Sequence, residues 1–116
     1  TADLKGKKIG VQTGTTNETE AVNYTSDNLV IRYPDFVQAT SALNGGQVDA
    51  VFNDLPGAKG TITENPSLKI ASDPFTNEYY GIVFRKDDPN VQQIDNALAA
   101  IRIKGVLTDF KQKWLD

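Results

Sequence analysis

Two short segments of the chain carry groups that could bind a small charged molecule. Residues 13–16, Thr-Gly-Thr-Thr, follow a short apolar run and offer hydroxyl and backbone N–H groups, which suit an anion. Asp54 follows a second apolar run, residues 48–53, and offers a carboxylate, which suits a cation. In an open α/β sheet, ligands bind outside the carboxyl ends of the strands, where the strand order reverses. A small zwitterion such as an amino acid would satisfy both segments at once, so we interpret them as a binding site.

Each of these residues also has a purely structural explanation. Gly14 can form the turn between a strand and a helix, and Thr15 can cap that helix. Asp54, which lies between a strand and Pro56, can cap the helix that follows. Gln12, the last residue of the first strand, can hydrogen-bond a ligand or face solvent at the sheet edge. The residues alone leave both explanations open.

Catalysis, metal binding and phosphate binding have little support in the sequence. The chain contains no His and no Cys, which excludes imidazole and thiolate metal ligands, cysteine nucleophiles and histidine bases. The loop at Gly14 lacks the lysine of a Walker A motif and the third glycine of a dinucleotide-binding fingerprint. No second carboxylate is expected beside Asp54 for acid–base chemistry. We therefore predict a chain that is not an enzyme and uses no metal or cofactor.

The composition is that of an ordinary globular domain, with 39% hydrophobic and 23% charged residues. The 12 basic and 15 acidic residues give a net charge of −3 without a basic block, which argues against nucleic-acid binding. No apolar run approaches the length of a membrane span. The chain opens with Thr1, so an upstream segment could have been removed, and the lack of cysteine says little about the compartment.

Alternating strands and helices are expected to position the two segments. The first strand is predicted over residues 7–12, and Thr15 and Glu18 fit a capping box at the start of the helix that follows. Asp35 is expected to cap a second helix, which ends at the Gly45-Gly46 pair. The other elements predicted up to residue 71 are strands at 29–33, 48–53 and 68–71 and a short helix that begins at 54–56. This alternation predicts a mostly parallel sheet with right-handed crossovers.

The alternation ends near residues 73–80, where we expect an organisational boundary. A β-prone run then occupies residues 79–84. A helix is predicted from Asp88 and Pro89, and Gly105 separates it from a final helix. The apolar positions of the two helices form one stripe each: Val91, Ile94, Leu98 and Ile101, then Leu107, Phe110 and Trp114.

Four ordered motifs resemble the polar amino-acid-binding proteins of bacterial ABC importers (solute-binding protein family 3). They are residues 3–16 (DLKGKKIGVQTGTT), 46–56 (GQVDAVFNDLP), 79–86 (YYGIVFRK) and 105–114, which ends in Lys-Trp. Together they cover nearly the whole chain. The resemblance implies the second lobe of a type II periplasmic-binding-protein fold. That lobe is a three-layer α/β structure, in which an open, mostly parallel sheet with strand order beginning 2-1-3 has helices on both faces.

The resemblance also implies roles for individual residues. Thr15 and Thr16 match the positions that hold the carboxylate of the ligand, and Asp54 matches the acidic residue that pairs with its α-ammonium group. Gln12 stands where the family often reads the ligand side chain, and Asn53 is expected close to the same region.

The chain departs from the family in length. Family members carry a first lobe before the segment that matches residues 3–6, and that lobe supplies an arginine and an aromatic residue to the ligand. We therefore predict two parts: residues 1–79 as a second-lobe α/β domain, and residues 80–116 as a crossover strand and C-terminal helices that in the family pack on the first lobe. Such a chain would carry only about half of the ligand site.

The function implied is the binding of a polar amino acid as the solute receptor of an ABC importer. The implied partners are the amino acid and the membrane subunits of the importer, and the implied location is extracytoplasmic, in the periplasm or as a cell-surface lipoprotein. A dehydratase-type enzyme and the amino-acid-sensing domain of a receptor are alternatives on the same fold, and the lack of a general base favours binding. Without a first lobe, the apolar stripes of the C-terminal helices are expected to fold back over the sheet or to drive self-association or a segment swap.

Overall fold

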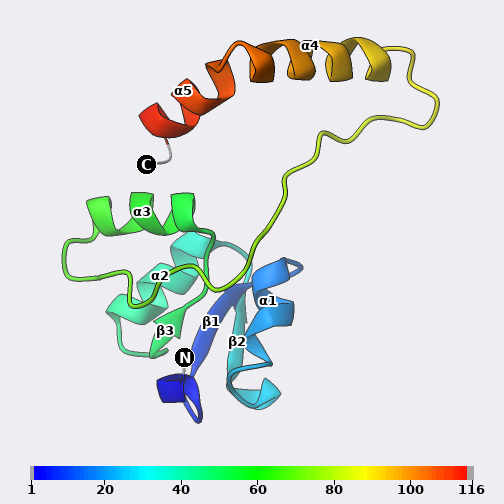
Figure 1. The fold of residues 1–116 in the computed structure, drawn as a ribbon. Coiled ribbons are helices and arrows are strands. Elements are labelled where there is room, and N and C mark those ends of the chain that lie inside the picture. Colours follow the sequence, from blue (N-terminus) through cyan, green and yellow to red (C-terminus); the bar gives the residue numbers. More distant parts are fainter. Residues whose placement is uncertain (1, 115–116) are drawn as a thin grey trace. The chain divides into compact units, whose positions relative to one another are not determined.

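The computed structural model describes residues 2–114, and the chain divides into two compact units. We call Thr1–Thr76 the N-terminal unit and Asn77–Asp116 the C-terminal unit. The N-terminal unit holds the sheet and the helices α1 to α3, and the C-terminal unit holds α4 and α5 (Figure 1). All the candidate binding residues therefore belong to the N-terminal unit.

The sheet of the N-terminal unit contains three parallel strands in the order β2-β1-β3. Their bounds are Ile9–Gln12 for β1, Val30–Tyr33 for β2 and Ala50–Val51 for β3. In the central strand, Ile9 is in register with Val30 on one side and with Ala50 on the other. The predicted parallel sheet with an order beginning 2-1-3 is confirmed.

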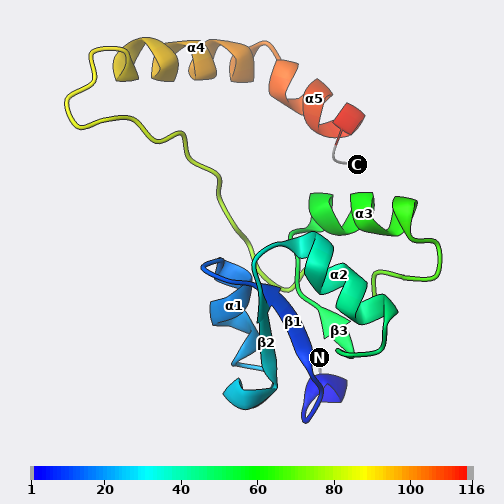
Figure 2. The same cartoon turned by 180° about the vertical axis from the view of Figure 1, so that it is seen from behind.

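Helices lie on both faces of this sheet. Their bounds are Thr16–Ala21 for α1, Phe36–Asn44 for α2 and Leu55–Glu64 for α3, with short 3₁₀ turns at Ala2–Leu4 and Asp27–Leu29. The chain passes from β1 through α1 to β2, then back through α2 to β3 on the other side of β1. Right-handed crossovers in these two directions place α1 and α2 on opposite faces, as Figure 1 and Figure 2 show. The predicted three-layer arrangement is therefore confirmed.

The core of the N-terminal unit is built on the central strand. Ile9 and Val11 are fully buried and cluster with Ala21, Val30 and Phe52. Residues two apart on a strand face the same side, so the side chains of Ile9 and Val11 enter the core together. Burial of each large apolar side chain contributes about 1.5–3 kcal/mol. This core holds the carboxyl end of β1 in place.

The ends of α2 follow the predicted capping pattern. Asp35 is the N-cap, and its side chain accepts a hydrogen bond from the backbone N–H of Gln38 at 2.8 Å. Gly45 is the C-cap, and Gly46 follows with φ of +70°, in the left-handed region that glycine adopts at least cost. The return of the chain towards β3 is thus determined locally.

The strand predictions after α2 are only partly confirmed. The strand predicted over residues 48–53 is limited to Ala50–Val51, and the prediction of a strand at 68–71 is wrong. The β-prone run at 79–84 pairs with no strand within the described residues, and Tyr79 and Val83 are 97% and 93% exposed. β propensity mostly measures packing against neighbouring strands, so an apolar run without such a neighbour does not form a strand.

The C-terminal unit consists of the two predicted helices. They are α4 (Val91–Ile103) and α5 (Val106–Trp114), and Gly105 separates them with φ of +75°. The N-cap of α4 is Asn90 rather than Asp88. The Asp88 side chain instead accepts from the backbone N–H of Asn90 at 2.9 Å, which fixes the turn just before the helix.

The apolar stripe of α5 carries two aromatic side chains that are more than half exposed. Phe110 is 55% exposed and Trp114 is 71% exposed. Together with Leu107 and Lys111 they line a wide, open pocket of about 360 Å³. None of the helices within residues 2–114 is long and apolar enough to cross a bilayer.

Candidate functional site

The loop of residues 13–16 continues directly from the central strand. The Thr13 N–H donates to the carbonyl oxygen of Tyr33 at 2.9 Å, which extends the β1–β2 pairing by one step. Gly14 then takes φ of +76°, and α1 begins at Thr16 with Thr15 as its N-cap. The first N–H groups of a helix have no partner inside the helix, so this loop can offer donors to an anion.

The predicted capping box forms only in part. The Thr15 side chain makes no capping bond; its Oγ1 donates to the carbonyl oxygen of Gln12 at 2.7 Å. The Glu18 carboxylate reaches back as expected, but it accepts from the N–H of Gly14 at 2.8 Å rather than from that of Thr15. The box is shifted because the N-cap hydroxyl is already used to close the turn at the end of β1.

Asp54 lies at the end of the neighbouring strand. The Phe52 N–H donates to the carbonyl oxygen of Gly10 at 3.1 Å, so the chain still runs beside β1 at this point. Asp54 is the N-cap of α3, yet its side chain makes no capping bond. Its Oδ1 instead accepts from Nδ2 of Asn17 at 3.0 Å. The side chain of Asp54 is thus directed towards the start of α1, which a simple capping role does not require.

Asn17 is the residue that sequence reasoning did not single out. It is the second residue of α1 and is half-buried, and its amide joins the loop after β1 to the end of β3. The signal that could have found it is its position directly after Thr16, at the start of a helix that borders the switch point. The structure therefore brings Thr15, Thr16 and Asp54 to one edge of the sheet, with Asn17 between them.

Asn53, the residue before Asp54, also lies at this edge and contacts the Asp54 backbone. Its Oδ1 accepts from the Asp54 N–H at 2.8 Å. A Cβ atom added at Gly57 would lie 2.8 Å from Nδ2 of Asn53, closer than real contacts allow. A glycine is therefore needed at position 57 for Asn53 to keep this place under the first turn of α3.

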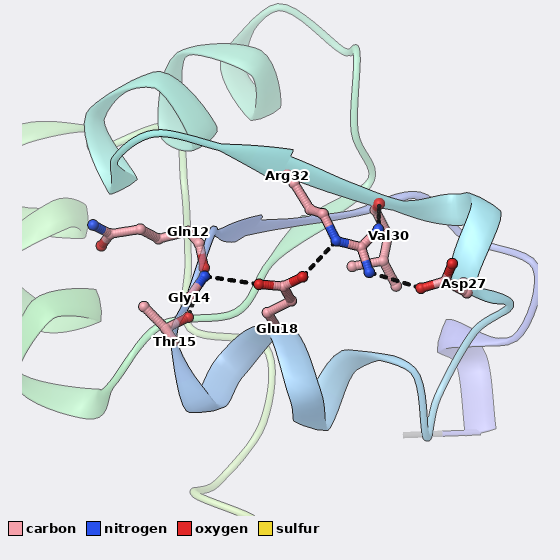
Figure 3. A network of polar contacts seen from close by, with 7 residues as sticks. All are labelled: Gln12, Gly14, Thr15, Glu18, Asp27, Val30 and Arg32. Atoms are coloured by element: carbon pink, nitrogen blue, oxygen red, sulfur yellow. Dashed lines mark hydrogen bonds and ion pairs between the residues drawn. The ribbon is translucent and has the colours of Figure 1, made fainter.

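Gln12 lies towards the other flank of the central strand. It is half-buried, and its Nε2 donates to the carbonyl oxygen of Pro34, directly after β2, at 3.3 Å. Figure 3 shows its amide directed away from Gly14 and Glu18. Asp54 follows β3, on the opposite side of β1 from β2, so the hydrogen bond of Gln12 is to the β2 side of this sheet edge.

A charged network holds the loop from the side of β2 (Figure 3). Glu18 pairs with Nε of Arg32 at 2.5 Å, and Nη2 of Arg32 pairs with Asp27 at 2.7 Å. The hydrogen bond from Arg32, followed by that from the Gly14 N–H, lowers the pKa of the Glu18 carboxyl below its usual value. The hydrogen bonds to Glu18 and Asp27 raise the pKa of the Arg32 guanidinium. Glu18 is therefore ionised wherever the loop is folded at neutral pH.

This edge of the sheet combines anion donors and a carboxylate where the strand order reverses. The connection from β1 leads to β2 on one side, β3 lies on the other side of β1, and Thr15, Thr16 and Asp54 follow the carboxyl ends of β1 and β3. This edge therefore remains the candidate site for a small molecule that carries both charges. Within the described residues, no group of three or more acidic side chains could hold a metal ion.

Amino-acid-binding proteins are similar to this chain in sequence and in structure. No protein-family model matches the chain. It is 31% identical over 119 residues to ABC transporter arginine-binding protein 1 of Escherichia coli strain K12, and the match covers 97% of this chain and 49% of that protein. It is 34% identical to the arginine-, lysine-, histidine-binding protein ArtJ from Geobacillus stearothermophilus, whose structure matches with a TM-score of 0.81 over 97% of this chain and 51% of that chain.

A third similar structure is the GluR0 ligand-binding core in complex with L-glutamate. It is 27% identical, with a TM-score of 0.86, and the match covers 99% of this chain and 52% of that chain. The chain spans about half the length of the curated relatives it matches. The predicted fold, one lobe of a type II periplasmic-binding-protein fold, is thus confirmed: the chain matches about half of each of these structures. The resemblance to amino-acid-binding proteins of ABC importers is confirmed as well.

Proposed function

We propose that this chain is the second half of a receptor that binds a polar amino acid for an ABC importer. The observation that carries the proposal is the match of nearly the whole chain to half of a transporter's arginine-binding protein. The candidate site lies at the switch point of that half, between the ends of β1 and β3. The named relatives are binding proteins, which supports binding rather than catalysis for this chain.

The ligand class follows from what the relatives share. The proteins similar to this chain include binders of arginine and of L-glutamate, whose side chains carry opposite charges. Both ligands have the same α-ammonium and α-carboxylate groups. We therefore propose that the residues at the switch point bind these two shared groups. Residues such as Gln12 then select the side chain of the ligand.

We propose a role for each residue of the site. Thr15 and Thr16 hold the α-carboxylate through their N–H groups and the Thr16 hydroxyl at the start of α1, since the Thr15 hydroxyl donates to Gln12. Asp54 pairs with the α-ammonium group, and charge-assisted hydrogen bonds of this kind are among the stronger ones. Asn17 orients Asp54 through the bond to its Oδ1.

The remaining contacts would come from the half that the relatives possess and this chain does not span. In the whole protein, that half would close on the ligand, and the importer's membrane subunits would receive the loaded receptor outside the cytoplasm. The similarity of this chain to binding proteins of ABC transporters supports these proposals about the whole protein.

The experiment is a ligand screen on the protein encoded by the complete reading frame around this chain. The 20 L-amino acids are compared by thermal shift, and the best ligand is titrated by calorimetry together with its analogues that lack the α-amino or the α-carboxyl group. We expect one polar amino acid to bind and both analogues to lose most of the affinity. Binding of no amino acid, or full retention of affinity by either analogue, would contradict the proposal.

A further inference from the structure

A line of polar contacts connects β2 with the loop that follows β1 (Figure 3). It runs from Asp27 to Arg32 at 2.7 Å, from Arg32 to Glu18 at 2.5 Å, and from the Gly14 N–H to Glu18 at 2.8 Å. The two oxygens of Glu18 are divided between the last two contacts, Oε1 facing Arg32 and Oε2 facing Gly14. Glu18 thus bridges the neighbouring strand and the loop.

The members of this line differ in exposure. The side chains of Glu18 and Arg32 are 24% and 37% exposed, whereas that of Asp27 is 72% exposed. Nη1 of Arg32 also donates to the carbonyl oxygen of Val30 at 3.1 Å, which holds the guanidinium against its own strand. Exposed ion pairs contribute little, so the Glu18–Arg32 pair is the structurally important contact and the Arg32–Asp27 pair is peripheral.

The loop depends on Glu18 because few other contacts hold it. The hydrogen bonds that fix residues 13–15 join Thr13 to Tyr33, the Thr15 hydroxyl to Gln12, the Glu18 N–H to the Thr15 carbonyl oxygen, and the Gly14 N–H to the Glu18 carboxylate. Only the last involves a charged group. Gly14 is also the residue with φ of +76°, and a Cβ built on it would meet no atom within 4 Å, so side-chain packing does not restrain it.

We infer that Glu18 and Arg32 are positioning residues, which hold the loop of residues 13–16 in the conformation that receives the ligand carboxylate. Glu18 fixes the Gly14 N–H, and Arg32 both orients and neutralises Glu18. Without Arg32, a bare carboxylate would lie beside the loop and repel a carboxylate ligand. The ligand part of this inference rests on the proposed function, whereas the loop part does not.

The loop part is tested without any ligand, in the full 116-residue chain. The chemical shift of the Gly14 amide is followed by NMR as the pH is lowered from 7 to 2. The charged side chains that act on Glu18 are Arg32 and Asp27. The midpoint of the Gly14 shift therefore reports the protonation of Glu18 in the presence of these two side chains. We expect a midpoint below the usual glutamate value, an upward shift in Arg32→Met, and no midpoint in Glu18→Gln.

Asp27→Asn is the matched control for the loop part, because it removes a charge from the same line at its exposed end. We expect its Gly14 midpoint to stay close to that of the unchanged chain. A Gly14 amide that does not titrate with Glu18, or a midpoint that Arg32→Met leaves in place, would overturn the inference.

The ligand part is tested in the complete protein with the amino acid that the screen identifies. We expect Arg32→Met to weaken binding by roughly tenfold. The double variant Glu18→Gln with Arg32→Met should regain most of that loss, because the bare carboxylate is gone and the amide oxygen at position 18 can still accept from the Gly14 N–H. Arg32→Lys and Asp27→Asn, each checked for folding by NMR, should lose less than Arg32→Met.

The outcomes separate the two proposals. Equal losses in Arg32→Met and in the double variant would show a merely structural role for Arg32 and overturn the ligand part. If the complete protein binds no amino acid, the proposed function fails and the ligand part fails with it. The Gly14 titration then still decides whether Glu18 and Arg32 position the loop.

Discussion

The two units of the chain treat their apolar residues in opposite ways. The N-terminal unit buries Ile9 and Val11 completely beneath its own helices, whereas the C-terminal unit leaves Phe110 and Trp114 more than half exposed within itself. The first unit contains a sheet that brings distant segments together, and the described part of the second contains two consecutive helices and no strand. The N-terminal unit thus has an apolar core of its own, whereas the C-terminal unit presents apolar side chains that a further surface could cover.

The largest expected effect is on stability and separates the two units. We expect Ile9→Ala to destabilise the N-terminal unit by about 2–5 kcal/mol, because it leaves a cavity in a fully buried position. The matched control is Ile103→Ala in the C-terminal unit, at a position that is 88% exposed. Urea denaturation followed by circular dichroism gives both values. A similar cost for the two substitutions would break the comparison.

The next effect concerns the site that the N-terminal unit carries. In the complete protein, Asp54→Asn should keep the fold and weaken amino-acid binding by roughly tens-fold, because a charge-assisted bond to the α-ammonium group is lost. Thr16→Val should weaken it less, since the backbone N–H survives. Calorimetry gives the affinities, with the melting temperature as the control for folding. An Asp54→Asn protein that binds within a factor of two of the unchanged one would return Asp54 to a structural role.

A third effect concerns the surface that the C-terminal unit lacks. We propose that the isolated chain covers its apolar stripes by self-association or by folding back, since burial of each large side chain contributes about 1.5–3 kcal/mol. Light scattering should therefore report a dimer that Phe110→Ser with Trp114→Ser weakens, or a monomer in which tryptophan fluorescence shows Trp114 shielded. A monomer with Trp114 fully accessible to a quencher would contradict both forms of the proposal.

The smallest effect is the pH dependence of the Glu18–Arg32 pair. The pKa of Glu18 is lowered in the folded chain, mainly by the hydrogen bond from Arg32. The pair therefore stabilises the fold above the unfolded pKa of glutamate, and this contribution is lost as the pH falls through the lowered folded value. Denaturation at a series of pH values between 7 and 2 should show a shallower loss for Glu18→Gln than for the unchanged chain. Identical slopes would exclude the pair as a source of acid sensitivity.

The parts of the fold that were predictable depend on short-range signals. The caps at Asp35 and Gly45 and the helix break at Gly105 each follow from a few neighbouring residues, and the structure confirms them. The strand at 68–71 was not predictable, because an apolar run forms a strand only where a partner edge exists. The predicted strand at 48–53 is longer than β3 (Ala50–Val51), although the Phe52 N–H still donates to the Gly10 carbonyl oxygen.

The candidate site shows the same division. Thr15 at the start of a helix and Asp54 at the end of a strand follow from local patterns, so sequence reasoning finds both. The bond between Asn17 and Asp54 joins residues 37 positions apart, and the bridge from Arg32 to Glu18 joins residues 14 positions apart. Such contacts are set by the strand order, so they become visible only when the sheet is assembled.

The measurement that tests the central claim most directly compares one ligand in two proteins. The amino acid identified by the screen is titrated by calorimetry into the complete protein and into the 116-residue chain alone. If this chain supplies only part of the site, it should bind more weakly by at least about 2 kcal/mol, since buried charge pairs of the size expected from the other half contribute about 2–5 kcal/mol. Equal affinity of the 116-residue chain and the complete protein would contradict the claim that the chain is half of a two-part amino-acid receptor.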